Sequence, residues 1–298
     1  MILKRKPNEN MLKTHRMNSF SRILLVVMVI YAILLLVPYV FALMASFKEL
    51  GDFSDHMFGF TAPTLDNYKK VMQEFVYPVV LKDGSAGYYD FWGMVLTSFL
   101  VSIGGAFAMT MTPCVTAYCA AKFDFAIGKI LTTIVYVTMS IPIIGTTAAS
   151  IQMTHTIGIH DTIPGTWFLK ATFLGMNYLL YLGNFQSIPS DYTEAAYMDG
   201  AGNFRIFFQI MFPMVRNLFN LQMILGFVQI WSDYSMPMYY LPSKPTLSLA
   251  MLNFSSLSAT SVTMQMAGCM LLSLPNLVLF VLFKDKFMGN IQMGGIKG

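Results

Sequence analysis

Six apolar segments, each about 20 residues long, dominate the sequence of this 298-residue chain. A run of this length can cross the hydrocarbon core of a bilayer, where only a helix satisfies its own backbone hydrogen bonds. The sequence therefore predicts an all-α membrane protein with six transmembrane helices. We place them near residues 23–47, 93–119, 127–151, 166–185, 217–238 and 261–283.

The composition excludes an ordinary soluble domain. Hydrophobic residues make up 55% of the chain and charged residues only 11%, whereas about a quarter of a soluble protein is charged. The net charge of +4 is small and the basic residues lie near the ends of the apolar segments, so nucleic acid is not an expected partner. The three cysteines, Cys114, Cys119 and Cys269, all fall within apolar segments and are predicted to be buried thiols rather than a disulfide or metal framework.

The distribution of basic residues predicts the orientation. Residues 1–22 carry six lysines and arginines, and the following run from Ile23 to Phe47 is too long for a cleaved signal peptide, so it is expected to remain as the first span. Placing the amino end inside puts thirteen basic residues on the cytoplasmic side and six outside. The tails at 1–22 and 284–298 and the segment at 188–215 are therefore predicted to be cytoplasmic.

Two outer segments follow from this topology. Residues 48–91 form a long connection that is rich in turn residues, and a folded flap and a mobile one are both compatible with it. Residues 239–260 carry Pro242 and Pro245 and then a partly apolar stretch, which is compatible with a segment that dips back toward the membrane.

The polar segment 188–215 lies between two apolar runs and must face water or a partner. Asp191 is predicted to cap a short helix, with Glu194 three positions later completing a capping box. Residues 200–202, Gly-Ala-Gly, predict a turn, after which Asn203 is expected to cap a second helix that continues to Pro213.

Both short helices offer surfaces for contact. In the first, Ala195 and Ala196 leave room for close approach, while Glu194 and Asp199 are hydrogen-bond acceptors. In the second, apolar side chains at helical spacing predict one apolar face, made of Phe204, Phe207, Phe208 and Met211. That face fits a groove on another protein or, alternatively, an amphipathic helix resting on lipid headgroups.

The order of residues in this segment resembles the EAA loop of binding-protein-dependent ABC importer permeases. Glu-Ala-Ala at 194–196 is followed by Gly200, then by nine residues, then by Ile-Met-Phe-Pro at 210–213; only Phe212 departs, standing where leucine is usual. The resemblance covers nearly the whole chain and points to the smaller permease of the maltose-type carbohydrate branch. Further similar segments are 45–48, 63–68, 117–125, 231–234 and 294–298.

The resemblance implies a type I importer of several subunits in a bacterial cytoplasmic membrane. A second, larger permease, a dimer of ATPase subunits and an extracytoplasmic sugar-binding protein are the implied partners. The chain has no Gly-x-x-x-x-Gly-Lys-Ser/Thr phosphate loop, so it binds no cofactor and ATP and Mg²⁺ are expected on the partner ATPases. The implied ATPase-coupling residues are Glu194, Ala195, Ala196, Asp199, Gly200, Ile210 and Pro213. Residues 292–298 are a second implied ATPase contact, and 241–258 an implied contact with the binding protein.

Candidate substrate contacts surround Asp233, an acid within the fifth predicted span. Trp231 and Tyr234 flank it, and Gln222 and Gln229 share a helix face with Gly226, so these side chains are candidates for a substrate path. The alternative is that the aromatic rings belong to the interfacial belt and the glutamines to helix packing. His155 and His160, with Asp161, do not have the spacing of a metal site.

Two other classes of function are less consistent with the sequence. A secondary solute carrier would need ionisable residues near the midplane for ion coupling, and it would leave the 188–215 segment unexplained. An intramembrane enzyme would need paired catalytic residues within the spans. The expected function is therefore sugar or oligosaccharide import by a transport subunit that is not itself an enzyme.

Overall fold

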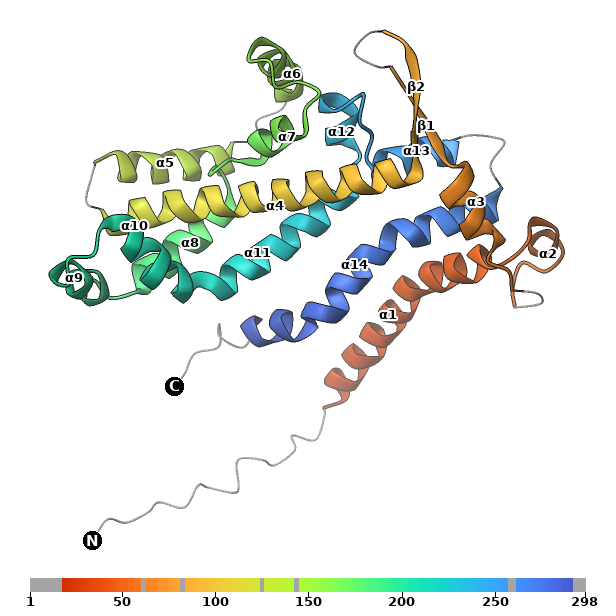
Figure 1. Ribbon diagram of the computed structural model, residues 1–298. Coiled ribbons are helices and arrows are strands. Elements are labelled where there is room, and N and C mark those ends of the chain that lie inside the picture. Colours follow the sequence, from red (N-terminus) through yellow and green to blue (C-terminus); the bar gives the residue numbers. More distant parts are fainter. Residues whose placement is uncertain are drawn as a thin grey trace.

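A computed structural model describes residues 18–59, 63–80, 84–123, 126–141, 145–256 and 261–291. Helices make up almost all of this structure, and one two-stranded hairpin projects from it (Figure 1). In chain order the elements are α1 (Ser19–Ser46), α2 (Leu50–Asp55), α3 (Asp66–Glu74), β1 (Val76–Val80), β2 (Ala86–Asp90), α4 (Phe91–Lys122), α5 (Ala126–Ser140), α6 (Thr146–Thr156), α7 (Ile163–Lys170), α8 (Met176–Ser187), α9 (Asp191–Met198), α10 (Asn203–Ile206), a π-helical turn (Phe207–Met211), α11 (Phe212–Ser232), α12 (Ser235–Tyr240), α13 (Leu247–Ser256) and α14 (Val262–Ile291).

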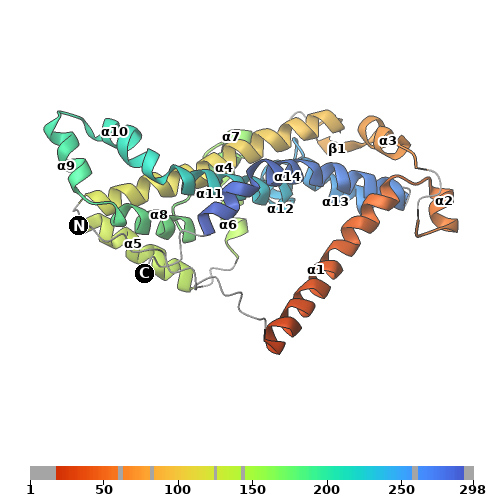
Figure 2. The ribbon, with the colours of Figure 1, turned by 90° about the horizontal axis from the view of Figure 1, so that it is seen from below.

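Helix α4 is the axis of the bundle. It packs against α7, α8 and α11, while α14 lies beside α11 and α1 packs on α14 (Figure 1, Figure 2). Its 32 residues extend over about 48 Å, more than the hydrocarbon thickness of a bilayer. We call residues 48–91 the flap and the end of α4 at Phe91 the flap end. We call the other end, at Lys122, the loop end, because the 188–215 loop lies there.

Among the residues that the structure describes, four helical stretches have the length and composition of a membrane span. They are Ser19–Ser46, Phe91–Lys122, Asn203–Ser232 and Val262–Lys284. These stretches confirm long apolar helices at the first, second, fifth and sixth predicted positions. The fifth span is displaced toward the amino end of the chain. Its helix begins at Asn203 and ends at Ser232, whereas the predicted span was 217–238.

The third and fourth predicted spans are not continuous helices in the described residues, so six unbroken spans are not confirmed. Within 127–151, α5 ends at Ser140 and α6 begins at Thr146; Pro142 lies outside the described residues. Within 166–185, the chain leaves the helix after Lys170 and re-enters it at Met176. Gly175, just before α8, has a φ of 146°, a left-handed conformation that a helix interior does not contain.

The described parts of the flap, 48–59, 63–80 and 84–91, are folded, which answers the question that the sequence left open. Helices α2 and α3 are followed by the antiparallel hairpin of β1 and β2, in which Val76 pairs with Asp90 and Val80 with Ala86. The second strand runs directly into α4, where the Asp90 carboxylate accepts a hydrogen bond from the Gly93 amide at 3.2 Å. This side-chain cap fixes the start of the central helix.

The described part of the 239–260 segment, residues 239–256, also folds onto the bundle. Helix α13 packs against α4 and α14 and buries Leu247, Ala250 and Met251. The Leu247 amide donates a 2.7 Å hydrogen bond to the buried hydroxyl of Ser98 on α4. The segment is thus a packed element of the flap end.

Two hydrophobic cores divide the molecule along α4. The flap-end core joins α3, α4, α11, α13 and α14 around Trp231 and Met94. The loop-end core joins α4, α8, the π-helical turn and the start of α11 around Tyr118 and Phe207. Helices α4 and α11 take part in both, so they connect the two ends.

Candidate functional site

The 188–215 loop begins with α9, whose N-cap residue is Ser190. Its carbonyl oxygen accepts hydrogen bonds from the Glu194 amide at 3.0 Å and from the Thr193 hydroxyl at 2.6 Å. No side chain caps this helix, so the predicted capping box of Asp191 and Glu194 is wrong. Both acids instead lie in the first turn, where the partial positive charge of the helix amino end favours them.

The predicted turn after α9 is confirmed. Gly200 has a φ of 75°, and its amide donates to the Tyr197 carbonyl at 3.0 Å, while the Ala201 amide donates to the Ala196 carbonyl at 3.0 Å. A left-handed residue in this position closes a helix carboxyl end, and glycine adopts it without strain. Asn203 is the first residue of α10 and not its cap; its side chain accepts a 2.6 Å hydrogen bond from the Tyr197 hydroxyl across the turn.

The second helix of the loop does not end at Pro213. Helix α10, the π-helical turn and α11 follow one another without a break from Asn203 to Ser232. Pro213 is exposed and directly follows the π-helical turn inside this continuous helix, where its missing N–H removes one intrahelical hydrogen bond. The loop is therefore continuous with a membrane-spanning helix rather than separated from it.

The outer surface of α9 combines acids with exposed apolar side chains. Glu194, Ala195, Asp199 and Gly200 are exposed. In the part of the chain that the structure describes, neither carboxylate has an ion-pair partner. The apolar neighbours on this surface are Tyr192, Tyr197, Met198 (89% exposed) and Phe204 (83% exposed). Clustered apolar exposure of this kind marks an interaction surface.

The inner surface of the loop is buried in the loop-end core. Ala196 is buried, which corrects its predicted place on a close-approach surface, and Ile210 is half-buried. The predicted common face of four apolar residues is also wrong, because Phe207 and Met211 are buried while Phe204 and Phe208 are exposed. The π-helical turn changes the helical register at this point and separates the two pairs.

Aromatic rings attach the loop to the central helix. Phe207 lies 4.9 Å from Tyr118 of α4 between ring centroids, and Tyr118 lies 5.5 Å from Phe185 of α8. The Lys122 ammonium, at the end of α4, donates to the Ile188 carbonyl. A displacement of the loop would therefore act on α4, α8 and α11 together.

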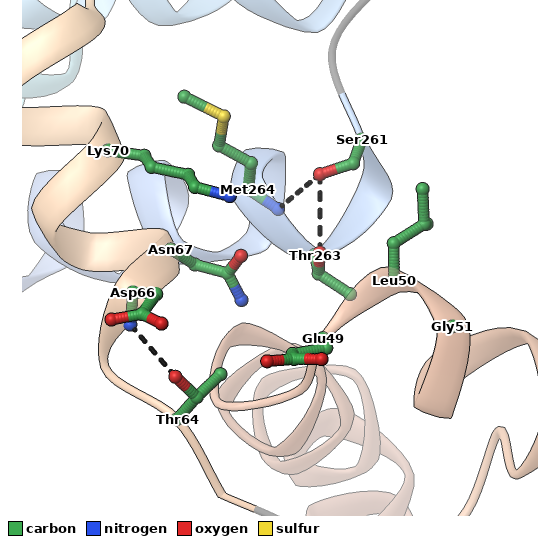
Figure 3. A pocket seen from close by; sticks show the side chains of 10 residues that line it. All are labelled: Glu49, Leu50, Gly51, Thr64, Asp66, Asn67, Lys70, Ser261, Thr263 and Met264. Atoms are coloured by element: carbon green, nitrogen blue, oxygen red, sulfur yellow. Dashed lines mark hydrogen bonds between the residues drawn. The ribbon is translucent and has the colours of Figure 1, made fainter.

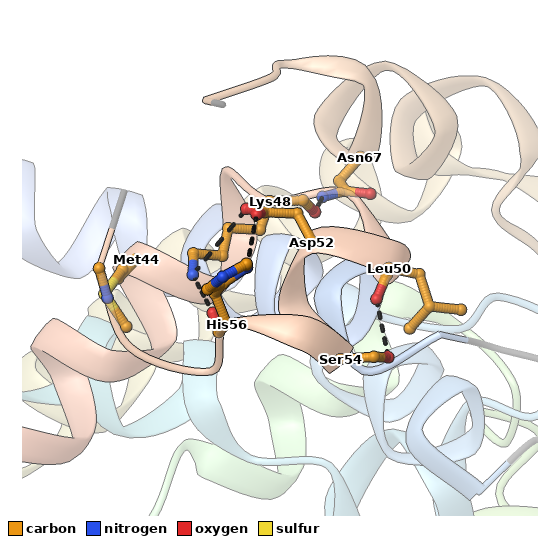
Figure 4. Close-up of polar contacts among 8 residues, drawn as sticks. Met44, Lys48, Leu50, Asp52, Ser54, His56 and Asn67 are labelled. Carbon is orange, nitrogen blue, oxygen red and sulfur yellow. Dashed lines mark hydrogen bonds and ion pairs between the residues drawn. The ribbon is translucent and has the colours of Figure 1, made fainter. Parts of the chain in front are cut away.

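At the flap end, two segments similar to the family pattern are in contact. The Asn67 amide donates to the Lys48 carbonyl at 2.7 Å (Figure 4). It also donates to the Ser46 carbonyl at 3.0 Å, and the Ser46 hydroxyl lies 2.7 Å from that of Tyr68. These bonds tie α3 to the end of α1. The buried Lys48 (1% exposed) donates to the His56 carbonyl and lies 4.0 Å from the Asp52 carboxylate.

A polar cavity of about 460 Å³ opens beside this contact. It lies between α2, α3 and the start of α14 (Figure 3). Carboxylates of Glu49 and Asp66 line it together with Lys70, Asn67 and hydroxyl groups of α14. Most of its lining residues belong to the flap, so the cavity lies at the flap end.

The five predicted substrate-path residues do not form one site. Trp231 is 1% exposed and donates its indole N–H to the Leu272 carbonyl at 2.8 Å, so it holds α11 against α14. Gln222 is buried, whereas Gln229 and Tyr234 are exposed. Gly226, on the same face as the glutamines, packs against Ala106 of α4 in this chain.

Asp233 has a different environment. One carboxylate oxygen accepts hydrogen bonds from the Ser235 amide and hydroxyl and from the Met236 amide, and the other lies 3.5 Å from the Lys170 ammonium. Burial raises the pKa of Asp233, but these hydrogen bonds and Lys170 outweigh it and lower the pKa overall. Lys170 was not among the predicted site residues, although a lysine within the apolar segment 166–185 was a visible signal.

The rings of His155 and His160 stack on each other, with 3.7 Å between their centroids. Burial, together with His155, lowers the pKa of His160, and Asp161 partly opposes this. The Asp161 carboxylate is directed to Ser243, accepting hydrogen bonds from its amide at 3.0 Å and from its hydroxyl. Asp161 has a φ of 58°, unusual for a residue other than glycine.

Comparison with known protein families identifies the family to which this architecture belongs. The family model described as "Binding-protein-dependent transport system inner membrane component" matches residues 113–285, which include the whole 188–215 loop. The chain belongs to this family. The permease resemblance seen in the sequence is thereby confirmed.

Similar permeases are known from bacteria, and their names are those of carbohydrate permeases. The melibiose/raffinose/stachyose import permease protein MelC of Bacillus subtilis (strain 168) is 26% identical, over 93% of this chain and 97% of its own length. The maltodextrin transport system permease protein MdxG of the same organism is also 26% identical, over 92% of this chain and 93% of its own.

A solved structure has the same fold as this permease. A chain of a bacterial ABC transporter involved in the import of the acidic polysaccharide alginate aligns with a TM-score of 0.70, at 18% identity, over 89% of this chain and 95% of that one. At this identity the similarity concerns the fold alone.

Proposed function

We propose that this permease imports a sugar or oligosaccharide across the cytoplasmic membrane and is driven through its 188–215 loop by a separate ATPase dimer. The observation that carries the proposal is the surface of α9, where exposed acids and apolar side chains adjoin a helix that is continuous to Ser232. An ATPase with a basic residue and an apolar groove would match this surface. ATP and Mg²⁺ belong to the ATPase, and this chain binds neither.

Three further partners complete the proposed importer. A second, larger permease and the bilayer cover the exposed apolar side chains of α1, whose central part has no buried residue. An extracytoplasmic sugar-binding protein delivers the substrate at the flap end. A chain of a bacterial alginate ABC transporter in complex with an alginate pentasaccharide-bound periplasmic protein has the same overall fold at a TM-score of 0.55, which is consistent with this arrangement.

In this proposal the loop end faces the cytoplasm. Lys122, Arg205 and Arg216 lie on or beside the loop, as expected for a cytoplasmic segment. The flap end then faces outward, and both termini lie inside. ATP-driven closure of the ATPase dimer would move the loop and tilt the spans attached to it, a rigid-body transition.

A charge reversal tests the coupling role. Glu194→Lys is expected to abolish co-purification with the ATPase and sugar uptake while the protein stays in the membrane. The matched control is Glu74→Lys, which reverses an exposed acid on α3 at the opposite end. Normal uptake by Glu194→Lys would refute the docking role of α9.

Removing the ATPase subunits from the cells separates an importer of this type from a secondary carrier. A secondary carrier would transport without the ATPase, so uptake would survive in cells that lack it. The proposed importer would lose uptake in those cells.

The sugar is identified by uptake assays with raffinose, maltotriose, galactobiose and diacetylchitobiose. These sugars represent the substrates in the names of similar permeases. Cells expressing the complete importer are expected to take up at least one of them, and failure with all four would count against the proposed substrate class.

A further inference from the structure

A second polar cavity lies where α6, α7 and α12 meet, at the end of α11 that is remote from the loop. It has a volume of about 330 Å³ and lies at the flap side of the membrane-spanning stretch 203–232. Its polar lining consists of Lys170, Asp233, Thr147, Ser150, Ser235, Tyr239 and Tyr240. The ion pair of Lys170 and Asp233, at 3.5 Å, forms one wall.

The charges of this cavity balance one another. Both side chains of the pair are about three-quarters buried, so an ammonium and a carboxylate are held together within the protein at the end of an apolar helix. Asp233 is already bonded to Ser235 and Met236, whereas the Lys170 ammonium has three N–H groups and a single carboxylate beside it. A ligand that fits here has no net charge and offers hydrogen-bond acceptors to Lys170.

Unused hydroxyl groups surround the pair. Thr147 and Ser150 on α6 and Tyr239 and Tyr240 on α12 line the cavity. Within the described parts of the chain, none of these four hydroxyls makes a hydrogen bond. Polar groups that converge on a cavity without internal partners are available to a ligand.

The two tyrosines also provide ring surfaces. Tyr239 is 46% exposed and Tyr240 is half-buried. A flat amphipathic ring beside hydroxyls, an ammonium and a carboxylate suits a pyranose, which has apolar C–H faces and a belt of hydroxyl groups. The alternative is that the ion pair of Lys170 and Asp233 only holds two helices together. That role would need neither the hydroxyl groups nor the cavity beside the pair.

We propose that this cavity binds one uncharged pyranose ring of the transported sugar during passage. The inference rests on the proposed function, because it needs a sugar to be transported. It assigns Lys170, Ser150 and Tyr239 to substrate contact, and it leaves Trp231 and Gln222 to helix packing.

Cysteine labelling tests the site directly. In a background in which the exposed native thiol is removed by Cys269→Ala, Ser150→Cys is introduced into the complete importer in intact cells. The cells are treated with a membrane-impermeant methanethiosulfonate, with and without the sugar that they transport from the set above. At a sugar concentration about ten times that for half-occupancy, labelling is expected to slow about tenfold.

Ser54→Cys, on the exposed face of α2, is the matched control and should be labelled at the same rate with and without sugar. Equal labelling of Ser150→Cys in both conditions would overturn the inference. Protection of both positions would also overturn it, because it would indicate a general change of conformation rather than occupancy of the cavity.

A second measurement does not depend on labelling. In proteoliposomes with the binding protein, Lys170→Met is expected to lower sugar import about tenfold while ATP hydrolysis persists, because the ligand loses a charged hydrogen bond but the loop is intact. Lys69→Met removes the exposed ion pair with Asp66 and should change neither rate. Unchanged import by Lys170→Met would overturn the inference, as would a parallel loss of import and hydrolysis.

These outcomes differ from failure of the proposed function. If the unmodified importer takes up none of the sugars, or hydrolyses no ATP in response to the loaded binding protein, the proposed function fails and this inference fails with it. If import and hydrolysis are normal but the cavity is not protected, only the sugar site is wrong.

Discussion

The two ends of α4 are held by different kinds of contact. At the flap end, directional hydrogen bonds join segments far apart in the sequence, such as Asn67 to Ser46 and Asp161 to Ser243. At the loop end, aromatic rings such as Phe207 and Tyr118 pack on one another. Fewer side-chain hydrogen bonds join distant segments there among the described residues, such as Lys122 to Ile188 and Thr132 to Tyr178. The hydrogen bonds require one geometry, whereas apolar packing is not directional and tolerates small displacements.

This difference has a functional meaning within the proposed importer. In that importer the hydrogen bonds keep the flap end in one conformation. The aromatic contacts keep the loop attached to α4 while it moves. Mutations at the flap end are therefore expected to reduce stability with ATPase coupling retained, and mutations at the loop end to reduce coupling as well.

The largest effect is expected from Phe207→Ala. It leaves a cavity among Tyr118, Phe185 and Phe212 and should lower the free energy of unfolding by about 3 to 5 kcal/mol. Thermal unfolding in detergent and binding-protein-stimulated ATP hydrolysis measure the two effects. Phe204→Ala, which removes an exposed ring on the same loop, is the control for stability. Retained coupling in a folded Phe207→Ala protein would break the comparison.

Asn67→Ala tests the flap. The substitution leaves the Ser46 and Lys48 carbonyls without their donor, which should cost about 2 to 4 kcal/mol. Hydrogen exchange should rise across 63–80, while ATP hydrolysis by the assembled importer stays near normal. Gln73→Ala, at an exposed position of the same helix, should change neither quantity.

Asp161→Ala removes the link to Ser243 and should cost about 1 to 3 kcal/mol. Asp161→Asn keeps an acceptor and a side chain that tolerates the left-handed conformation, so it should lose less. Thermal unfolding of the two variants gives the ranking. Equal losses would mean that the carboxylate charge, rather than the geometry of the link, matters at the flap end.

Gly200→Ala sharpens the comparison at the loop end. The added methyl group meets no atom within 4 Å, so the expected cost of about 1 to 2 kcal/mol comes from the left-handed backbone alone. Gly202→Ala is a close control, since Gly202 also has open space around it but a φ of −75°. Uptake should fall only in Gly200→Ala.

The smallest effect is expected from Lys69→Met. The Lys69 and Asp66 side chains are both largely exposed, and such pairs contribute less than about 0.5 kcal/mol in many cases. A thermal unfolding midpoint that differs clearly from that of the unmodified protein would show that surface charges also stabilise the flap.

Local signals in the sequence predicted a large part of this structure. Long apolar runs identified four helices, and the turn at Gly200 followed from the conformational freedom of glycine. The start of α9 was predicted at Asp191 for the wrong reason, because the cap is the carbonyl of Ser190 rather than a side chain.

The remaining features depend on the tertiary structure. Apolar composition indicates burial or contact with lipid, but it does not determine continuity, so the interruption between Lys170 and Met176 was invisible. The same holds for Asp161 and Ser243, which are 82 positions apart, and for Lys170 and Asp233, whose pairing requires α7 to lie beside the end of α11. A sequence pattern does not predict which residues far apart in the chain will contact one another.

The unbroken helix from Asn203 to Ser232 is also a lever. Its 30 residues make a rod of about 45 Å, with the loop at one end and the cavity of Lys170 and Asp233 at the other. Pivoting such a rod by about 10° about one end displaces the other by about 8 Å, comparable to the width of a sugar ring. A modest swing at the ATPase side would thus be enough to open or close the space that a single ring occupies.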